Sequence, residues 1–436
     1  MDDSEEIYVK YNLDLGYYNR NKIKTKDYEV NNTKYRILNY DQDVICDNDQ
    51  EYGKYRSVIL DPTQEPPKIL SFSPPKSVTP QYFKDKYPKI DDSILVNEIV
   101  EGTMINLFYD PRINSWEIST KGAVCGNYWF FRNQYPSIPN TMASNQPTFR
   151  KMFLEALRCL PNMDLKDCSL LNELSKEYCY CFVMQHPANH IVNYITNPTL
   201  YLVAVYHTHF KNSQEGSHVT SIPPTVFEEW DCFVNVRGII EFPKRFEEED
   251  YDELYNKYCS PNAQYNLVGI MCLNIGSGER ACIENEAYKN VRELRGNHPN
   301  LQYQYLCLKN MGKVKEFLRY FHNYKKIFYH FYKQYTDFIS DTHQSYISYY
   351  VKKSGIKISK KFFPLIYKIH HEVFLPAKLS GEPIIIRRQF VADYVGKLSP
   401  NVLLYYLNYN KKENAMDGNE LCISAIEESM STQTVG

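Results

Sequence analysis

The amino-acid sequence predicts an α+β protein, with a body of antiparallel sheets followed by an all-helical C-terminal domain. Two patterns predict this fold class. From about residue 55 to residue 284, short runs rich in β-branched and aromatic residues stand between turns that contain proline, glycine and asparagine, as is typical of strands. After about residue 308, apolar residues instead recur every three or four positions, which is the spacing of helices.

Strands are expected wherever such an apolar run lies between turn residues. The segments 103–109 and 116–120 form a hairpin in this prediction, with a loop that begins at Asp110-Pro111. One helix interrupts the strands, because the apolar residues of 148–160 fall on a single helical stripe. The other expected strands are 55–60, 68–72, 180–184, 200–206, 267–273 and 281–284.

An apolar seam of about four heptads runs through residues 314–342. One helix over 313–350 would be roughly 57 Å long at about 1.5 Å per residue. Because further helical patterns follow at 360–377 and 387–408, we expect an intramolecular helical domain rather than a coiled coil with a single partner. The expected divisions of the chain are an N-terminal extension (1–50), the strand-rich body (51–308), the helical domain (309–408) and a flexible tail (409–436).

Composition narrows the class of protein. The 50 basic and 52 acidic residues nearly balance, which argues against a wholly basic nucleic-acid coat protein. No apolar run reaches the roughly 18 residues that cross a bilayer, and the first 30 residues hold no signal-like apolar segment. The 12 cysteines include no CxxC pair, so free thiols in a reducing compartment are expected. These observations predict a soluble, intracellular protein without a membrane partner.

Several short motifs follow one another along the body. Residues 69–77 end in a turn at Pro74-Pro75-Lys76, and residues 98–105 contain Glu101-Gly102. The segments 116–122, 181–192 and 268–271 come next, with 288–292 downstream. This order resembles that of the phage-type RNA ligases, a family of covalent nucleotidyltransferases, and of the ligase-like proteins of large DNA viruses. The resemblance covers about residues 50–310 and is only architectural beyond them.

The resemblance implies a nucleotidyltransferase body of the ATP-grasp-like ligase kind, with ATP and Mg as cofactors and a host cytoplasm or a virion as location. In this family a lysine amine attacks the α-phosphate of ATP, forms a lysyl-adenylate and releases pyrophosphate. The amine must be deprotonated, so its pKa is lowered by neighbouring positive charge. The family signature is Lys-x-Asp/Glu-Gly, and a later lysine-x-lysine strand neutralises the phosphates.

Two departures from the family pattern remove this chemistry. When Glu101-Gly102 is aligned with the signature, Ile99 occupies the position of the nucleophilic lysine. The closing lysine strand falls on residues 281–284, where no lysine stands and Glu284 would repel a triphosphate. We therefore expect a catalytically degenerate pseudo-ligase that binds RNA or nucleotide or acts as an assembly partner.

Other positions keep groups suited to a nucleotide. Lys76 matches a lysine that lies near the phosphates in the family, and Arg56 and Lys121 are similar candidates, although each is also compatible with an ordinary surface cation. Glu101 and Gly102 retain the signature. His186 and Asn189 follow a strand in a turn, where they would either contact the ligand or hold the turn. The candidate nucleotide-binding residues are therefore Arg56, Lys76, Glu101, Gly102, Lys121, His186 and Asn189.

A basic segment with neighbouring tyrosines indicates contact with single-stranded RNA, since arginines and aromatics are what such binding uses. Tyr303 and Tyr305 lie within it, and a second basic stretch spans 352–361. The candidate RNA-binding residues are Arg292, Arg295, Lys309, Lys313 and Lys315. No metal site is expected, because His207 and His209 share a strand face without a third ligand at suitable spacing.

Two other functions remain open. The first is an active ATP-dependent RNA ligase in which a displaced lysine, Lys121 or Lys76, serves as nucleophile. The second is a virion or interaction protein that self-associates or binds a protein partner through residues 314–342.

Overall fold

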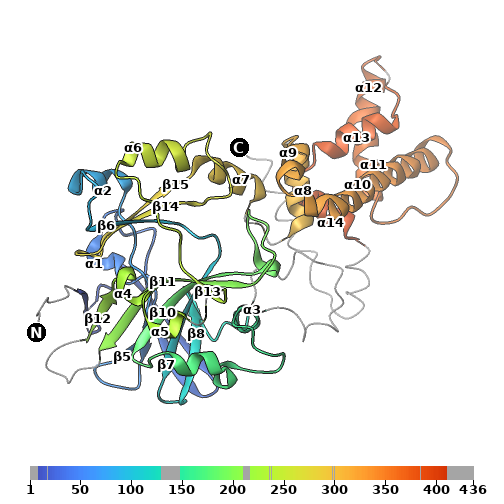
Figure 1. Ribbon diagram of the computed structural model, residues 1–436. Coiled ribbons are helices and arrows are strands. Elements are labelled where there is room, and N and C mark those ends of the chain that lie inside the picture. Colours follow the sequence, from blue (N-terminus) through green and yellow to red (C-terminus); the bar gives the residue numbers. More distant parts are fainter. Residues whose placement is uncertain are drawn as a thin grey trace, which may run out of the picture. The chain divides into compact units, whose positions relative to one another are not determined.

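The computed structural model describes residues 8–16, 18–128, 148–209, 217–234, 236, 238–296, 298, 300–382 and 384–409. The chain divides into two compact units, and the boundary falls between residues 297 and 298 (Figure 1). Unit 1 holds every strand of the described chain, and unit 2 is helical. The predicted α+β fold class, with antiparallel sheets and a helical C-terminal region, is confirmed.

Three sheets make up the strand content of unit 1. The large sheet has eight strands among the described residues, in the order β1 (Val9–Leu13), β12 (Ser217–Ile222), β11 (Thr199–His209), β10 (Tyr178–Gln185), β7 (Thr103–Asp110), β8 (Ser115–Thr120) and β9 (Ala123–Val124), with β13 (Ile240–Glu241) beside β11. The four-stranded sheet is β2 (Ile23–Val30), β3 (Thr33–Tyr40), β4 (Val58–Asp61) and β5 (Lys68–Phe72). The three-stranded sheet is β15 (Arg280–Glu284), β14 (Gly269–Asn274) and β6 (Ile94–Glu98).

Short helices connect these strands. Unit 1 contains α1 (Gln50–Gly53), α2 (Pro80–Lys86), α3 (Phe149–Ala156), α4 (Pro224–Phe227), α5 (Asp231–Val234), α6 (Tyr251–Leu254) and α7 (Glu286–Arg295). The tighter or wider turns are η3 (Leu165–Asp167), η4 (Ser169–Glu173), η5 (Pro187–Asn189) and η6 (Tyr255–Cys259). No described helix is long and apolar enough to traverse a bilayer.

The large sheet buries both faces, because its strands alternate side chains between two separate cores. On one face Leu107 and Ile118 pack with Phe153 of α3 and Phe182 of β10. On the other face Phe108 and its neighbours Cys179, Cys181 and Tyr206 meet the four-stranded sheet, which contributes Ile37, Ile59 and Phe72. Figure 1 shows α3 and the four-stranded sheet of unit 1 around the large sheet. The second of these interfaces bears on the candidate site.

A buried ion network ties the four-stranded sheet to the β7–β8 hairpin. Arg112, in the hairpin loop, donates to Asp61 of β4 (Nη1 to Oδ1, 2.7 Å) and to Asp110 of β7 (Nη2 to Oδ2, 2.8 Å). The Tyr35 hydroxyl also donates to Asp110, at 2.8 Å, and the guanidinium lies over the Tyr35 ring. Both carboxylates are fully buried. One arginine therefore compensates two negative charges inside the protein.

The N-terminal residues differ from the expected extension. β1 pairs with β12 in the large sheet, and β2 and β3 supply half of the four-stranded sheet. Tyr35, Ile37 and Leu38 of β3 are buried in the core between the sheets. These strands were not predicted from the sequence. β2 carries charged residues along an exposed edge, so it lacks the alternation of apolar and polar residues that marks a half-buried strand.

Unit 2 contains the predicted helical seam, but not as one helix. Its elements are α8 (Leu301–Asn310), α9 (Val314–Tyr320), η7 (His322–Tyr324), α10 (Lys325–Tyr346), η8 (Ile347–Val351), α11 (Phe363–Lys368), η9 (Ile369–Phe374), α12 (Leu375–Leu379), α13 (Arg388–Gly396) and α14 (Pro400–Leu407). The single helix expected over 313–350 is wrong, because the chain turns at Phe321. The turn lets Phe317 stack on Phe328 at 4.8 Å between ring centroids, whereas 11 residues of straight helix span about 16 Å.

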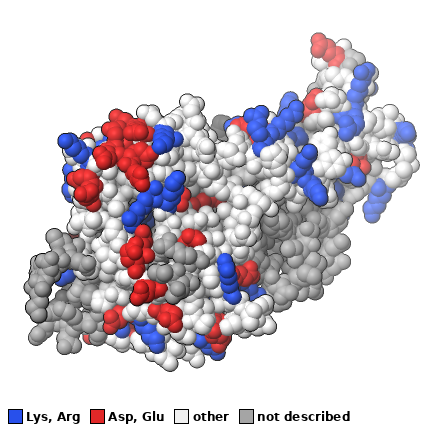
Figure 2. Space-filling view, viewed as in Figure 1, with Lys and Arg blue, Asp and Glu red and all other residues white. Residues whose placement is uncertain are grey.

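The apolar side chains of the predicted seam are buried within unit 2. Phe317, Phe321, Phe328 and Phe338 are all buried among the rings of the helical unit. Self-association of the folded chain would therefore have to use other side chains than these. The acidic stretch 246–253 contains the start of α6 and forms an acidic patch on unit 1 (Figure 2).

Candidate functional site

Most predicted nucleotide-binding residues lie at one end of the large sheet. Because β7 is antiparallel to both β8 and β10, the start of β7 shares an edge with the ends of those two strands. Glu101 and Gly102 precede β7, Lys121 follows β8, and His186 follows β10. The order of the strands thus brings together segments that are far apart in the sequence.

Glu101 is an internal anchor of this edge. Its buried carboxylate accepts hydrogen bonds from the backbone N–H groups of Ile191 and Val192, each at 3.0 Å, and of Asn193 at 3.2 and 3.1 Å. The carboxylate also faces Tyr288 of α7, where burial and then Glu101 raise the pKa of the phenol far above its usual range. Its oxygens are therefore engaged by the protein itself.

Gly102 is needed for close packing of strands. A Cβ at this position would lie 2.5 Å from the Met184 carbonyl oxygen and 2.7 Å from a methyl group of Val183. Both of these atoms belong to β10, which pairs with β7. The absence of a side chain here serves the sheet, because β10 occupies the space that a side chain would need.

His186 and Asn189 hold the turn that follows β10. The Nδ1 atom of His186 accepts from the Ala188 N–H at 3.1 Å, and its Nε2 atom lies 2.8 Å from an oxygen of Glu155 on α3. The side-chain amide of Asn189 donates to the Thr103 hydroxyl at 2.8 Å. Both side chains are buried. Together with Glu101 and Gly102 they form a wall whose polar groups are satisfied from within.

Lys76 is likewise engaged. Its ammonium donates to the Asp47 carbonyl oxygen at 2.6 Å and lies 3.3 Å from the Asp47 carboxylate. Its backbone N–H donates to the Gly53 carbonyl oxygen at 2.9 Å, which fixes the turn after β5 against α1. The Asp47 carboxylate is mostly exposed, so a ligand phosphate could exchange with it.

A different set of cations is not compensated by carboxylates. We name Arg56, Lys121 and Arg280 the basic cluster. Arg56 precedes β4, Lys121 follows β8 and Arg280 begins β15. Within the described ranges no carboxylate oxygen lies within 4.0 Å of any of the three side chains. A protein that gathers three cations without counter-charge leaves room for an external anion.

Electrostatics shows that Arg56 stands near both other members of the basic cluster. Burial, and then the charge of Arg56, lower the pKa of the Lys121 amine below its ordinary value. The same two causes, in the same order, lower the pKa of the Arg280 guanidinium. The side-chain amide of Asn39 on β3, oriented with its NH₂ toward them, donates to the carbonyl oxygens of Arg56 and Lys121. This bond links the two segments that carry those cations.

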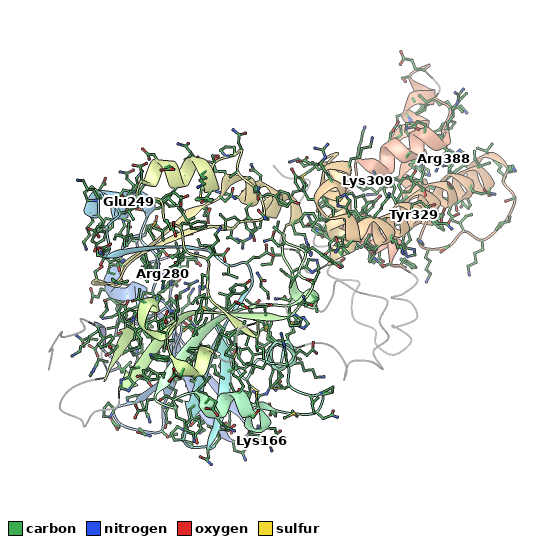
Figure 3. The ribbon with its side chains drawn as sticks, viewed as in Figure 1. Lys166, Glu249, Arg280, Lys309, Tyr329 and Arg388 are labelled. Atoms are coloured by element: carbon green, nitrogen blue, oxygen red, sulfur yellow. The ribbon has the colours of Figure 1, made fainter. Side chains whose placement is uncertain are left out.

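Arg280 stands at the first position of β15 in the three-stranded sheet, where Figure 3 labels it. Its Nε lies 3.4 Å from the Ser77 hydroxyl, and its carbonyl oxygen accepts from the Val78 N–H at 2.8 Å. Its charge reaches Tyr11 of β1, whose pKa is raised by burial to about 12 although Arg280 lowers it. Sequence reasoning missed Arg280, which stands one residue before the segment inspected for closing lysines.

Buried polar atoms lie on the adjoining sheet face. Cys181, Asn106 and Ser119 pair across β10, β7 and β8, and their side chains face the four-stranded sheet. The Asn106 amide donates to the Ser73 hydroxyl at 2.6 Å. Among the described residues, the Asn106 Oδ1, Ser119 Oγ and Ser57 Oγ atoms are buried without a hydrogen-bond partner. Buried polar groups left unsatisfied in a native protein require an explanation, and a bound ligand or water supplies one.

The structure also defines the position that the sequence comparison aligned with the nucleophilic lysine of the ligases. Ile99 follows β6 and is held by its backbone, whose N–H donates to the Gly269 carbonyl oxygen at 2.9 Å. Its side chain is aliphatic and cannot form a bond to phosphorus. Glu284, at the end of β15, is exposed and lies 3.9 Å from Lys289.

The predicted RNA-binding residues fall in both units. Arg292 and Arg295 belong to α7 of unit 1, where they line a cavity of about 340 Å³ with Lys289, although Arg295 is itself buried. The other three lie in unit 2, in α8, in the turn before α9 and in α9. Lys309 is placed over the Tyr335 ring at 4.0 Å, whereas Lys313 and Lys315 are exposed. These five residues thus do not form one patch within either unit.

Metal-binding side chains do not gather in the described chain: no group of three or more histidine, cysteine, aspartate or glutamate residues is arranged to hold an ion. His207 instead lies 3.5 Å from Glu177. Since the basic cluster supplies no carboxylate, a magnesium ion would find its oxygen ligands on a bound polyphosphate and not on these residues.

Arg280→Met is expected to raise the melting temperature of unit 1 by a few degrees. The substitution keeps the aliphatic stem but removes one of three uncompensated charges, and repulsion between partly exposed like charges is worth about 1 kcal/mol or less. Thermal unfolding followed by tryptophan fluorescence measures the change. Arg280→Lys is the control, because it retains the charge and should give no gain. A clear fall in both variants would mean that the arginine is held mainly for packing.

No protein-family model matches the chain, and no curated protein matches it either. Two solved structures are similar in part. A point mutant of the Naegleria gruberi RNA ligase, with ATP and Mn, is 9% identical with a TM-score of 0.28 over 46% of this chain and 51% of that chain. A putative ATP-dependent DNA ligase from Aquifex aeolicus is 11% identical with a TM-score of 0.34 over 63% of this chain and 62% of that chain. The chain thus spans about half of the first protein and about three fifths of the second.

Proposed function

We propose that unit 1 binds a nucleoside triphosphate such as ATP through the basic cluster, in the manner of a ligase-like nucleotidyltransferase, without forming a covalent adenylate. The observation that carries this proposal is the gathering of Arg56, Lys121 and Arg280 without a carboxylate, in a body whose nucleophile position holds Ile99. A pseudo-ligase of this kind retains the recognition of the substrate and lacks the bond-forming step.

The cluster suits a polyphosphate by charge. A triphosphate carries several negative charges in a short chain, and each cation that contacts it makes a charge-assisted hydrogen bond. Burial above all, and then the charge of Arg56, lower the pKa values of Lys121 and Arg280, and a bound anion would offset the second of these causes. Asn106 and Ser119, each with a buried atom that lacks a partner, stand in register with Cys181, a thiol that the charges of Arg280 and Arg56 reach. ATP therefore fits the residues present, and the chain's own role in this proposal is to bind and orient it.

Loss of the covalent step follows from the position of Ile99. Adenylation forms a phosphorus–nitrogen bond and releases pyrophosphate, so it requires an amine with a free electron pair. Neither the Ile99 side chain nor any side chain of Ala281, Cys282 and Ile283 supplies one. Cys282 is a poor substitute nucleophile, because burial above all raises the pKa of its thiol to about 11.

Arg56→Ala and Lys121→Ala are each expected to weaken ATP binding about 10-fold or more, since a hydrogen bond to a charged group contributes roughly 1.5–3 kcal/mol. Isothermal titration of the full chain with ATP measures the dissociation constant. Lys166→Ala is the matched control, because Lys166 is an exposed lysine of the same unit. Equal affinity in all four proteins, or no ATP binding by the parent, would reject the proposed site.

Incubation with α-labelled ATP and magnesium is expected to leave the parent protein unlabelled after denaturation. A stable radioactive band would instead support a second function, that of an active ligase with a displaced nucleophile. Lys121 is the residue favoured for that role, because burial and Arg56 already lower the pKa of its amine. Loss of such a band in Lys121→Ala, with retention in Lys76→Ala, would identify it.

A further inference from the structure

A row of exposed aromatic rings crosses one side of unit 2. Tyr349 of η8 lies 5.6 Å from Phe363 of α11, and Phe363 lies 6.2 Å from Tyr367, measured between ring centroids. Tyr367 in turn lies 4.1 Å from the imidazole of His371. Phe363, Tyr367 and His371 are spaced four residues apart, so one helical face presents them together. We name these four residues the aromatic row.

The aromatic row is open to solvent. Tyr349, Phe363 and Tyr367 are 43%, 39% and 48% exposed, which is high for rings that could have been buried. Burial of apolar area is the main stabilising contribution to folding. Three adjacent exposed rings therefore forgo stability that the fold would gain by burying them. The arrangement thus indicates a surface that something else covers.

The charge around the row defines what that partner is. Residues 342–371 contain six lysines and no aspartate or glutamate. Lys352, Lys353, Lys357 and Lys360 are exposed, and within the described chain none has a carboxylate oxygen inside 4.0 Å. A partner for this surface must therefore carry negative charge as well as flat apolar groups.

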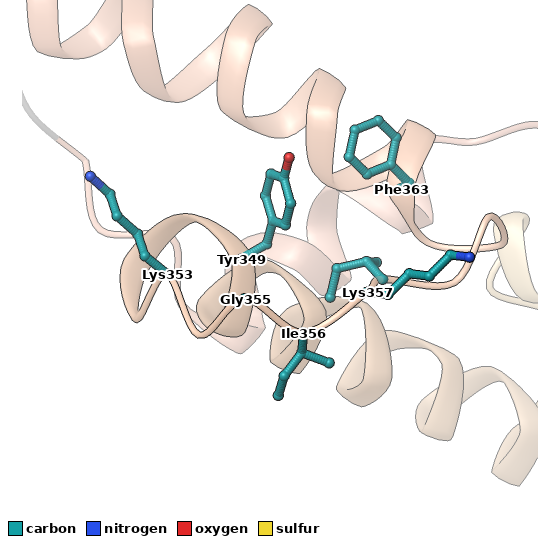
Figure 4. Close-up of a pocket in the computed structure, with 7 residues that line it drawn as sticks. Tyr349, Lys353, Gly355, Ile356, Lys357 and Phe363 are labelled. Atoms are coloured by element: carbon teal, nitrogen blue, oxygen red, sulfur yellow. The ribbon is translucent and has the colours of Figure 1, made fainter.

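A cavity lies beside the first two rings. It has a volume of about 490 Å³ and is lined by Tyr349 and Phe363 together with Lys353, Ile356 and Lys357. Figure 4 shows Tyr349 and Phe363 directed toward one another, with the ammonium ends of Lys353 and Lys357 extending to opposite sides of them. Flat rings in the middle with cations on both flanks match a base flanked by its two phosphates.

We propose that the aromatic row and its lysines bind single-stranded nucleic acid, independently of the nucleotide site of unit 1. Single strands expose their bases, which stack on aromatic side chains with little sequence preference, while lysines track the backbone. A duplex hides its bases, so it should bind only through its phosphates and therefore more weakly.

The test is fluorescence anisotropy of the full chain with a labelled 12-nucleotide oligouridylate, and with the same length of oligothymidylate and of duplex. We expect the double variant Tyr349→Ala/Phe363→Ala to bind the single strands at least 10-fold more weakly, given roughly 1–3 kcal/mol per stacked base. The matched control is Tyr329→Ala/Tyr332→Ala, because these tyrosines of α10 are also exposed, with centroids 6.5 Å apart. This control should bind like the parent.

Salt dependence tests the lysines separately. The slope of log K against log[salt] should fall by about 1.4 in Lys353→Ala/Lys357→Ala, because each phosphate contact on a single strand contributes about 0.7. Lys326→Ala, an exposed lysine of α10, should change the slope little. Arg56→Ala should leave strand binding unchanged, so failure of the nucleotide site and failure of the aromatic row are distinguishable.

Three results would overturn the assignment to single strands. One is absence of binding by the parent at low salt, and another is equal loss in the tyrosine control. The third is a parent that self-associates in sedimentation and becomes monomeric in Tyr349→Ala/Phe363→Ala, since the row would then be an interface between copies of the chain. Circular dichroism of each variant confirms that a loss of binding is not a loss of folding.

Discussion

Glu101→Ala should destabilise unit 1 by about 3–5 kcal/mol, the range for removing one partner of a buried charged network. Alanine leaves the backbone N–H groups of Ile191, Val192 and Asn193 buried without an acceptor. It also removes the partner of the Tyr288 hydroxyl. Urea unfolding followed by tryptophan fluorescence measures the loss, and the probe reports on unit 1 because the last of the three tryptophans is Trp230.

Two variants sharpen this experiment. Glu101→Gln keeps one acceptor oxygen, so its loss should be intermediate. Glu51→Ala removes an exposed glutamate of α1 and should change the free energy of unfolding by about 0.5 kcal/mol or less. If Glu101→Ala unfolded like the parent but lost ATP binding, the carboxylate would be a ligand-binding group and not an anchor.

Arg112→Ala should cost a similar 3–5 kcal/mol, because Asp61 and Asp110 would remain buried without their common cation. The contrast is Arg36→Ala, which removes the partner of the exposed Asp27 carboxylate and should cost about 1 kcal/mol or less. The same unfolding measurement at neutral pH compares the two. Losses of equal size would show that the buried pair is no stronger than a surface pair.

The effect of Arg112→Ala should depend on pH. In the parent, burial alone would raise the pKa of Asp110, but the hydrogen bonds from Arg112 outweigh burial and hold it below its ordinary value. The stability that Asp110 contributes is therefore present above pH about 4 and is lost as the pH falls through its folded-state pKa. Without Arg112, burial raises that pKa, so the deficit of the variant should be largest near neutrality and shrink in acid.

The sequence predicted those helices and strands in which the pattern of apolar and polar residues matches the pattern of buried and exposed side chains. The hairpin of β7 and β8, the strands β10 and β11 and the helix α3 all appeared within a few residues of their bounds, because their apolar residues face two cores. β2 was missed because an exposed edge strand tolerates charges such as Lys24 and Asp27 on every side. The end of the helix at Phe321 was missed because the apolar periodicity continues through it. The contact between Phe317 and Phe328, which requires the turn, cannot be inferred from that periodicity.

The candidate site was also predicted only in part from the sequence. The sequence predicted Arg56 and Lys121 as candidate residues. It could not show that Lys76 already has a partner, because that partner, Asp47, is 29 residues away and is brought near only by folding. Arg280 joins Arg56 through the packing of the three-stranded sheet, and no spacing in the sequence predicts that encounter. The predicted RNA-binding residues are divided between two units although they are neighbours in sequence, and no spacing in the sequence marks that boundary.

The anchoring of Glu101 bears on how a catalytic signature in a sequence is interpreted. Folding alone is enough to retain a glutamate that holds three backbone groups and a glycine that admits a neighbouring strand, whether or not the chain catalyses a reaction. At position 99 the backbone N–H donates to the Gly269 carbonyl oxygen, a bond that does not depend on which side chain stands there. The acid and the glycine of a catalytic signature can therefore be required by the fold alone, so their presence in a sequence is not by itself a sign of the reaction.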